Sequence, residues 1–177
     1  MRSWLGLESE LQSADIVAAD AAPLTVVLGF GNVLLSDDGA GVQLVERLRS
    51  TLGAHTAQFI DAGTLSFSLL PYIEATTAML AIDAANIDGM AGDIALLEGP
   101  QMDQFLSSTR RRSVHEVGLI DLLDMARLRD RLPPRRALLC IQPGRIDWSE
   151  ELSVPVEGAL DEAGRQAAAL LQRWNNN

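Results

Sequence analysis

The sequence has only one cysteine, Cys140, and no lysine, because all 14 residues of the Lys and Arg class are arginines. A single cysteine excludes an internal disulfide and a cysteine-rich metal site. The absence of lysine excludes Schiff-base chemistry on a lysine and a phosphate-binding P-loop lysine. Because Cys140 falls within the apolar run Ala137–Ile141, we expect it to be an inert core residue and not a nucleophile.

Long hydrophobic runs are missing as well. The longest apolar stretches, such as Val26–Leu28 and Ala137–Ile141, are far shorter than the roughly 20 residues that cross a bilayer. Met1–Ala22 lacks the cationic start and apolar block of a secretory signal. The formal net charge of −10 would repel nucleic-acid phosphates. We therefore expect a cytoplasmic protein with no membrane insertion and no nucleic-acid partner.

What the sequence does contain is an alternation of short apolar runs with segments of helical period. The predicted strands are Leu24–Phe30, Ala57–Ile60, Ala78–Ile82, Asp93–Leu97 and Arg136–Ile141. The predicted helices are Gly39–Leu52, Phe67–Ile73 (kinked or ended by Pro71), a segment that begins at Ser113, and Val156–Trp174. This order predicts an α/β fold, a three-layer α/β/α sandwich with a mainly parallel five-stranded sheet. The short gap between the third and fourth strands favours a hairpin there, so one strand is expected to be antiparallel.

The chain is expected to form one domain. Residues 1–22 lack clear periodicity and are predicted to be an N-terminal extension, partly helical or disordered. Residues 23–174 hold all the predicted strands and helices without a linker that would divide them. Residues 175–177 are predicted to be a loose tail.

Acidic residues follow three of the predicted strands, where ligands bind in open α/β sheets. Asp37 and Asp38 stand in the loop Gly29–Gly41 after the first strand. A role as the N-cap of the next helix explains Asp37 equally well, and Asp38 is then the acid that remains available for function. Asp61 and Asp83 follow the second and third strands, and for both a turn or capping role is the simpler alternative.

His115 is expected in the first turn of a helix that opens with a capping box, Ser113 to Glu116. The helix dipole there disfavours a protonated imidazole, and a metal ligand must be neutral. Two carboxylates and an imidazole suit a divalent ion such as nickel or zinc. Asp38, Asp83 and His115 are therefore candidate metal ligands, although the H-E-x-x-H motif of ordinary zinc proteases is absent.

A nucleotide-binding loop is a weaker interpretation of Gly29–Gly41. Counted from Gly29, the G-x-G-x-x-G pattern needs its third glycine where this sequence has Leu34. The loop also carries two acids where a pyrophosphate would need bare backbone amides.

Several segments together resemble the hydrogenase maturation endopeptidases. Gly29–Gly41 resembles their opening pattern G-x-G-N-x-L-x-x-D-[DE]-x-x-G, with Asp38 at a position where some members have Glu. The other matching segments are Asp61–Thr64, Asp83-Ala84, His115–Leu119, Ile141–Pro143 and Leu152–Val156. They follow in the family's order from about Leu24 to Leu171. Ala62 departs from a usual Gly, and Cys140 stands where many members have Gly.

The resemblance implies an α/β/α fold and an endopeptidase of aspartyl or metallo type. Its substrate would be a [NiFe]-hydrogenase large-subunit precursor, which loses a C-terminal peptide after nickel insertion. The resemblance assigns Asp38, Asp83 and His115 as catalytic residues that bind nickel brought by the precursor. Zinc or cadmium is expected to occupy the same site in vitro, and the enzyme is expected to act as a monomer.

Seven further residues are candidates for substrate contact: Asn32, Asp61, Gly63, Thr64, Arg110, Arg111 and Arg112. The three arginines would pair with acidic groups of the precursor, although a solvated loop is the simpler interpretation. Three other functions stay open at this point. They are a metal-sensing chaperone that does not cleave the precursor, a nucleotide-binding protein, and an aminopeptidase-like hydrolase with its own metal.

Overall fold

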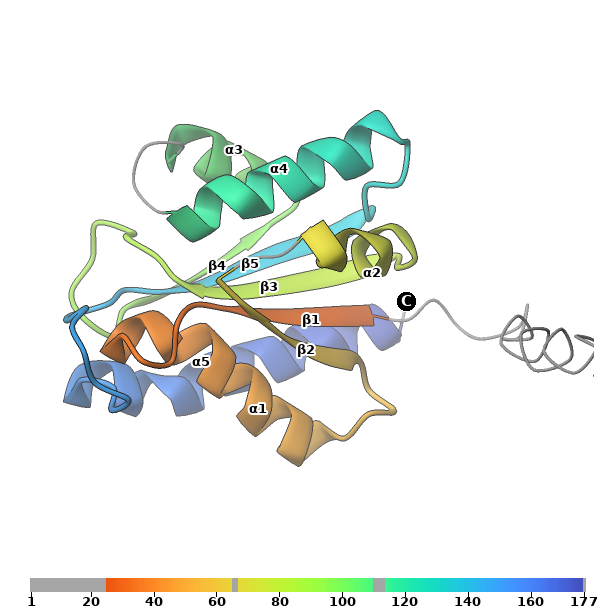
Figure 1. Cartoon of the computed structure of the whole chain (residues 1–177). Coiled ribbons are helices and arrows are strands. Elements are labelled where there is room, and N and C mark those ends of the chain that lie inside the picture. Colours follow the sequence, from red (N-terminus) through yellow and green to blue (C-terminus); the bar gives the residue numbers. More distant parts are fainter. Residues whose placement is uncertain (1–24, 65–66, 110–113, 177) are drawn as a thin grey trace, which may run out of the picture.

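The structure is a computed structural model that describes residues 25–64, 67–109 and 114–176 (Figure 1); for residues 109 and 114–117 it describes the backbone only. The predicted extension 1–22 therefore lies outside the described residues. No helix among the described residues is long and apolar enough to cross a membrane.

One mixed sheet of five strands forms the centre of the molecule, in the order β2-β1-β3-β5-β4. Its strands are β1 (Thr25–Phe30), β2 (Gln58–Gly63), β3 (Ala78–Ala84), β4 (Ile94–Glu98) and β5 (Arg135–Ile141). β1, β2, β3 and β5 run parallel, and β4 pairs antiparallel with β5. The predicted fold class is confirmed. The expected hairpin between β3 and β4 is wrong, because β5 lies between these two strands.

Helices cover both faces of the sheet (Figure 1). α1 (Ala40–Leu52) and α5 (Val154–Asn175) pack on one face, and α2 (Leu70–Glu74), α3 (Pro100–Thr109) and α4 (Val114–Leu128) pack on the other. Two short 3-10 helices, η1 (Ser36–Gly39) and η2 (Phe67–Leu69), lead into α1 and α2. Pro71 stands in the first turn of α2, so it begins this helix and does not end it.

α3 is a helix that the sequence-based prediction missed. Met102 and Leu106, one turn apart, are both buried against the sheet. Arg136 of β5 binds the carboxylate of Asp103 with two guanidinium nitrogens and so fastens α3 to the sheet. The side chain of Arg136 is only 14% exposed.

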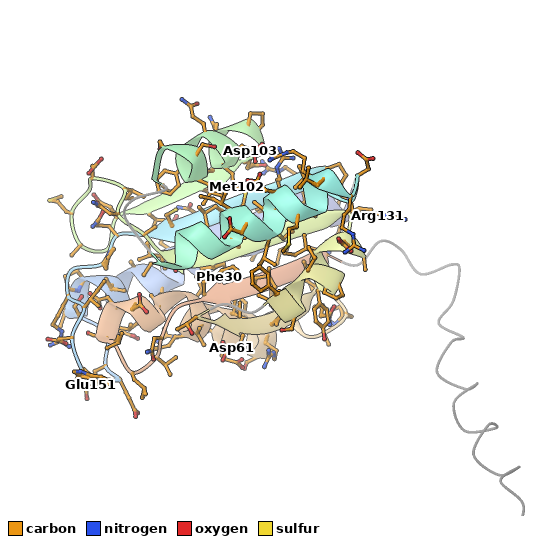
Figure 2. All side chains as sticks on the ribbon, turned by 45° about the horizontal axis from the view of Figure 1, so that its top comes forward. Phe30, Asp61, Met102, Asp103, Arg131 and Glu151 are labelled. Atoms are coloured by element: carbon orange, nitrogen blue, oxygen red, sulfur yellow. The ribbon has the colours of Figure 1, made fainter. Side chains whose placement is uncertain are left out.

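Alternate residues of the central strands supply two apolar cores. Val27 and Leu80 face α1 and α5, whereas Leu28 and Met79 face the opposite helices. Phe30 of β1 and Met102 of α3, both labelled in Figure 2, belong to this second core, on the face of the sheet that α3 and α4 cover. Burying each such side chain contributes about 1.5–3 kcal/mol. Cys140 is fully buried in β5, as predicted.

Candidate functional site

The candidate site lies where β1 and β3 run side by side. The connection that follows β1 passes through α1 on one face of the sheet, and the connection into β3 passes through α2 on the other face. Loops therefore diverge at the carboxyl ends of these two strands, and such switch points form the ligand-binding crevices of open α/β sheets.

Glycines allow the start of α1 to sit directly on the ends of both strands. A Cβ atom added at Gly41 would lie 2.4 Å from the carbonyl oxygens of Phe30 and Ile82. Gly31 has a φ of 122°, and a Cβ there would lie 1.8 Å from the carbonyl oxygen of Asp38. The glycines of the opening motif thus serve close backbone packing, which brings η1 into contact with β3.

This packing brings η1, which carries Asp38, against β3, which carries Asp83 near its carboxyl end. Asp38 in η1 is 7% exposed and Asp83 in β3 is 3% exposed. The Oδ2 atom of Asp38 accepts a hydrogen bond of 2.7 Å from the amide of Asn32. Asp83 lies within β3, in register with Cys140, although we expected it directly after the strand. Buried carboxylates are uncommon because burial of the charged form is costly, so Asp38 and Asp83 stay the candidates for a site at this end of the sheet.

The third candidate ligand, His115, belongs to the first turn of α4. Figure 1 shows that α4 begins at the end of the molecule where β1, β3 and β5 have their carboxyl ends. The side chain of His115 lies outside the described residues, and so do Arg110, Arg111 and Arg112. The described side chains alone contain no group of three metal-binding residues, so the meeting of His115 with Asp38 and Asp83 stays a prediction.

Asp37 has a different role from the helix cap that we considered. Neither η1 nor α1 has a side-chain cap, and Asp37 instead accepts hydrogen bonds from the loop that follows β5. Its donors are the amides of Gly144 and Arg145, at 2.9 and 2.8 Å, and both the amide and the hydroxyl of Ser153, at 2.6 and 2.7 Å. Burial alone would raise the pKa of Asp37, but the hydrogen bonds from Ser153, Gly144 and Arg145 outweigh it and lower the pKa.

Four of the seven predicted substrate-contact residues line one open pocket of 280 Å³ beside the switch point. The pocket is lined by Gly31, Asn32, Val33, Val42, Asp61, Gly63 and Thr64. Asp61 lies within β2, although we expected it after the strand, and its Oδ1 atom accepts a hydrogen bond of 2.8 Å from the amide of Gly63 beside a register shift in the pairing with β1. The pocket therefore lies between the loop after β1 and the end of β2, and one of its lining residues, Asn32, donates its amide to Asp38.

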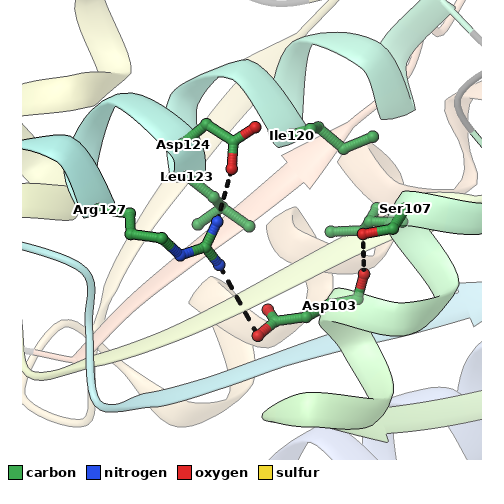
Figure 3. Close-up of a pocket in the computed structure, with 7 residues that line it drawn as sticks. Asp103, Ser107, Ile120, Leu123, Asp124 and Arg127 are labelled. Atoms are coloured by element: carbon green, nitrogen blue, oxygen red, sulfur yellow. Dashed lines mark hydrogen bonds and ion pairs between the residues drawn. The ribbon is translucent and has the colours of Figure 1, made fainter.

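A second small pocket, between α3 and α4, is a poor candidate. Figure 3 shows Arg127 between Asp124 and Asp103, at 2.6 and 3.8 Å. The volume of this pocket is only 30 Å³, and the charged groups that line it, Arg127, Asp124 and Asp103, already pair with one another. It joins two helices and contains none of the residues at the switch point, so we assign it a structural role.

Comparison with known proteins decides the family. The model of the hydrogenase maturation protease family matches residues 42–170. The chain belongs to the hydrogenase maturation protease family. Asp83 and His115 fall within the matched range, and Asp38 stands just before it.

Relatives of this maturation protease agree with that assignment. The hydrogenase expression/formation protein HupD of Rhodobacter capsulatus is 32% identical over 152 residues, which cover 84% of this chain and 71% of the relative. The hydrogenase 2 maturation protease of Escherichia coli is 27% identical and covers 83% of this chain and 90% of its own. The solved structure of the hydrogenase maturating endopeptidase HybD from E. coli has a TM-score of 0.77 at 26% identity, over 85% of this chain and 93% of that one.

Two residues of the protease that organise the site were not recognised from the sequence. Gln142 accepts hydrogen bonds from the amides of Ile87 and Gly89, at 2.9 and 3.3 Å, and Ser153 binds Asp37. Both stand in segments that resemble late family motifs, which was the available signal. Their partners are far away in the sequence, so spacing alone does not reveal what they do.

Proposed function

We propose that this protease removes the C-terminal peptide of a [NiFe]-hydrogenase large-subunit precursor in the cytoplasm, acting as a monomer after nickel has entered the precursor. The family supports the reaction class and the kind of substrate. The observation that carries the site assignment is the pair of buried carboxylates, Asp38 and Asp83, at the switch point of the sheet.

The three proposed ligands suit the task of recognising nickel that belongs to the substrate. Asp38 and Asp83 supply oxygen donors and His115 a nitrogen donor, which together suit a borderline divalent ion. Three protein ligands leave other coordination positions to groups of the precursor. An ion at this place would polarise the carbonyl of the scissile bond or lower the pKa of a bound water.

The surroundings of Asp38 and Asp83 support their part in this proposal. The amide of Asn32 holds the Oδ2 atom of Asp38 and so fixes the direction of the carboxylate. Asp83 is fixed by the central strand β3, which pairs on both sides. Ligands on rigid elements keep a metal site in a productive geometry.

The pocket beside Asp38 would receive the precursor segment next to the scissile bond. Asn32, Asp61, Gly63 and Thr64 contribute peptide groups and polar side chains to its wall. An extended peptide needs partners of this kind for its own amides and carbonyls. Arg110, Arg111 and Arg112 would bind acidic groups of the precursor.

Cleavage of purified precursor, with and without nickel, tests the proposal. The precursor should be shortened at its C-terminus only when it contains nickel, and mass spectrometry of the product gives the bond that is cut. A protein that binds nickel-loaded precursor without shortening it would be the metal-sensing chaperone instead. Stoichiometric zinc in the purified protein, together with cleavage of small unrelated peptides, would indicate a hydrolase with its own metal.

A further inference from the structure

Large apolar side chains are exposed on the loops that follow β1, β3 and β5 and at the first residue of α5. Six of them form what we call the apolar rim: Val33, Leu34, Met90, Ile146, Trp148 and Val154. Trp148 is 82% exposed and Met90 78%. Scattered apolar residues on a surface are ordinary, but a set of large ones around a site marks a binding surface.

Hydrogen bonds tie the loops of the apolar rim to one another. The amide of Ser149 donates to the carbonyl of Leu34 at 3.1 Å, and the amide of Ser36 donates to the carbonyl of Ser149 at 2.6 Å. Leu35 in the loop after β1 and Ser149 thus form a short parallel bridge. Trp148 directly precedes Ser149 in the sequence, so this bridge fixes the backbone beside it. Asp37 holds the same two loops together from the buried side.

The loop that carries Met90 is tied to the same group. The amide of Gly92 donates to the carbonyl of Gln142 at 2.9 Å, and Gln142 holds Ile87 in return. Gly92 also packs closely on the start of α5, because a Cβ atom added to it would lie 2.6 Å from the carbonyl oxygen of Pro155, the residue after Val154. The apolar side chains therefore stand on a preformed framework, and ordering them on binding costs little.

The position of the apolar rim indicates its partner. Figure 1 shows these loops at the end of the sheet where β1 and β3 have their carboxyl ends. Asp83 stands near the end of β3, and Asp38 stands in η1, which follows β1. Figure 2 shows Glu151, which belongs to the loop after β5, at the end of the molecule opposite to Arg131, which follows α4. A protein whose peptide bond is cut at the two carboxylates would approach this same end of the sheet, where the apolar rim lies. We infer that the apolar rim is the docking surface for the folded large-subunit precursor, an inference that rests on the proposed function.

Charge beside the apolar rim defines the chemistry of the partner's face. The loop between Gln142 and Ser153 has three exposed acids, Asp147, Glu150 and Glu151, against one base, Arg145. The whole chain has a net charge of −10. The matching face of the precursor should therefore be apolar with a basic margin, and added salt should weaken the association.

The test compares the double variant Ile146→Ser/Trp148→Ser with the wild-type protein. Both side chains are exposed, so the fold should tolerate the changes. Leu128→Ser is the matched control, because Leu128 is 86% exposed at the end of α4. Processing of nickel-loaded precursor gives kcat and KM, and calorimetric titration with the precursor gives the Kd. Sedimentation of each protein alone reports self-association.

We expect the double variant to raise both KM and Kd at least tenfold, with kcat within twofold of wild type, because uniform binding is lost. Leu128→Ser should change none of these constants by more than twofold. Unchanged KM and Kd in the double variant, or an equal loss in the control, would overturn the inference. So would a wild-type dimer that the double variant dissociates, because the apolar rim would then bind a second copy.

The two proposals fail in different ways in this experiment. If the wild-type protein binds precursor without cutting it and the double variant weakens that binding tenfold, the apolar rim stands and the protease function falls. If both proteins cut the precursor with the same KM, the protease function stands and the docking surface falls. If the wild-type protein neither binds nor cuts the precursor, both fall.

Discussion

Asp37 and Ser153, 116 positions apart in the chain, are joined by two hydrogen bonds. The amide of Ser153 donates to Oδ1 of Asp37 at 2.6 Å, and its hydroxyl donates to Oδ2 at 2.7 Å. The loop after β5 is thereby fixed against the turn that carries Asp38. A buried carboxylate with four donors thus sets the geometry of one side of the candidate site.

Replacing Asp37 should destabilise the protein. Asp37→Asn removes the charge and places an amide NH2 group where Ser153, Gly144 and Arg145 all donate. Leaving such donors buried without an acceptor should lower the free energy of unfolding by about 3 kcal/mol. Urea unfolding measures this loss. Glu150→Gln, a change at an exposed acid of the same loop, should stay within about 0.5 kcal/mol of wild type, and an equal loss in both variants would contradict the role of Asp37.

The contribution of Asp37 should also depend on pH. Because the pKa of Asp37 is lowered in the folded protein, folding favours the ionised form. The resulting stability is fully present above the pKa of the unfolded chain and is lost as the pH falls through the folded pKa. The gap in unfolding free energy between wild type and Asp37→Asn should therefore narrow as the solution becomes acidic. Urea midpoints from neutral pH downward give this gap, and a gap that widens in acid would show that the sign is wrong.

Two glycines in helices should respond in opposite ways to alanine. Gly41→Ala would press its methyl group onto the carbonyl oxygens of Phe30 and Ile82, both 2.4 Å from the ideal Cβ. It should cost about 1–3 kcal/mol by overpacking and reduce processing, because the start of α1 must move. Gly158 in α5 has no neighbour within 4 Å, so Gly158→Ala should stabilise the helix by about 0.5–1 kcal/mol. Thermal unfolding and processing assays on both variants make the comparison, and a destabilised Gly158→Ala would contradict it.

Loss of any proposed ligand should abolish processing without unfolding the protein. Asp38→Ala, Asp83→Ala and His115→Ala should each lower the rate of precursor cleavage by about 1,000-fold or more, while circular dichroism shows an intact fold. His55→Ala is the control, because His55 is the other histidine and is exposed. Full processing by His115→Ala would remove His115 from the site.

Much of the fold could be predicted because it depends on local pattern. Apolar β-branched runs gave the central strands, and the spacing of Val42, Val45 and Leu48 gave α1. α3 was missed although Pro100, Met102 and Leu106 carried a helix start and an apolar stripe. The position of β4 in the sheet was also predicted wrongly, because strand pairing depends on packing between segments that are far apart in the sequence.

The candidate site, like the fold, could be predicted from the sequence only in part. Asp38 and Asp83 could be chosen because they follow or end predicted strands, and in the structure Asp83 stands near the end of β3 while Asp38 stands in η1, which contacts β3. The role of Asp37 could not be predicted, because its partners stand in a loop more than a hundred positions later. A capping role needs only the next few residues, so it was the natural hypothesis for Asp37 and it is wrong.

A crystal of the full chain soaked in cadmium, measured for anomalous scattering, tests most directly whether Asp38, Asp83 and His115 can share one ion. We expect a single strong anomalous peak at about 2.0–2.6 Å from a carboxylate oxygen of Asp38, one of Asp83 and a ring nitrogen of His115. A peak bound by other residues, or His115 turned away from the two carboxylates, would contradict it.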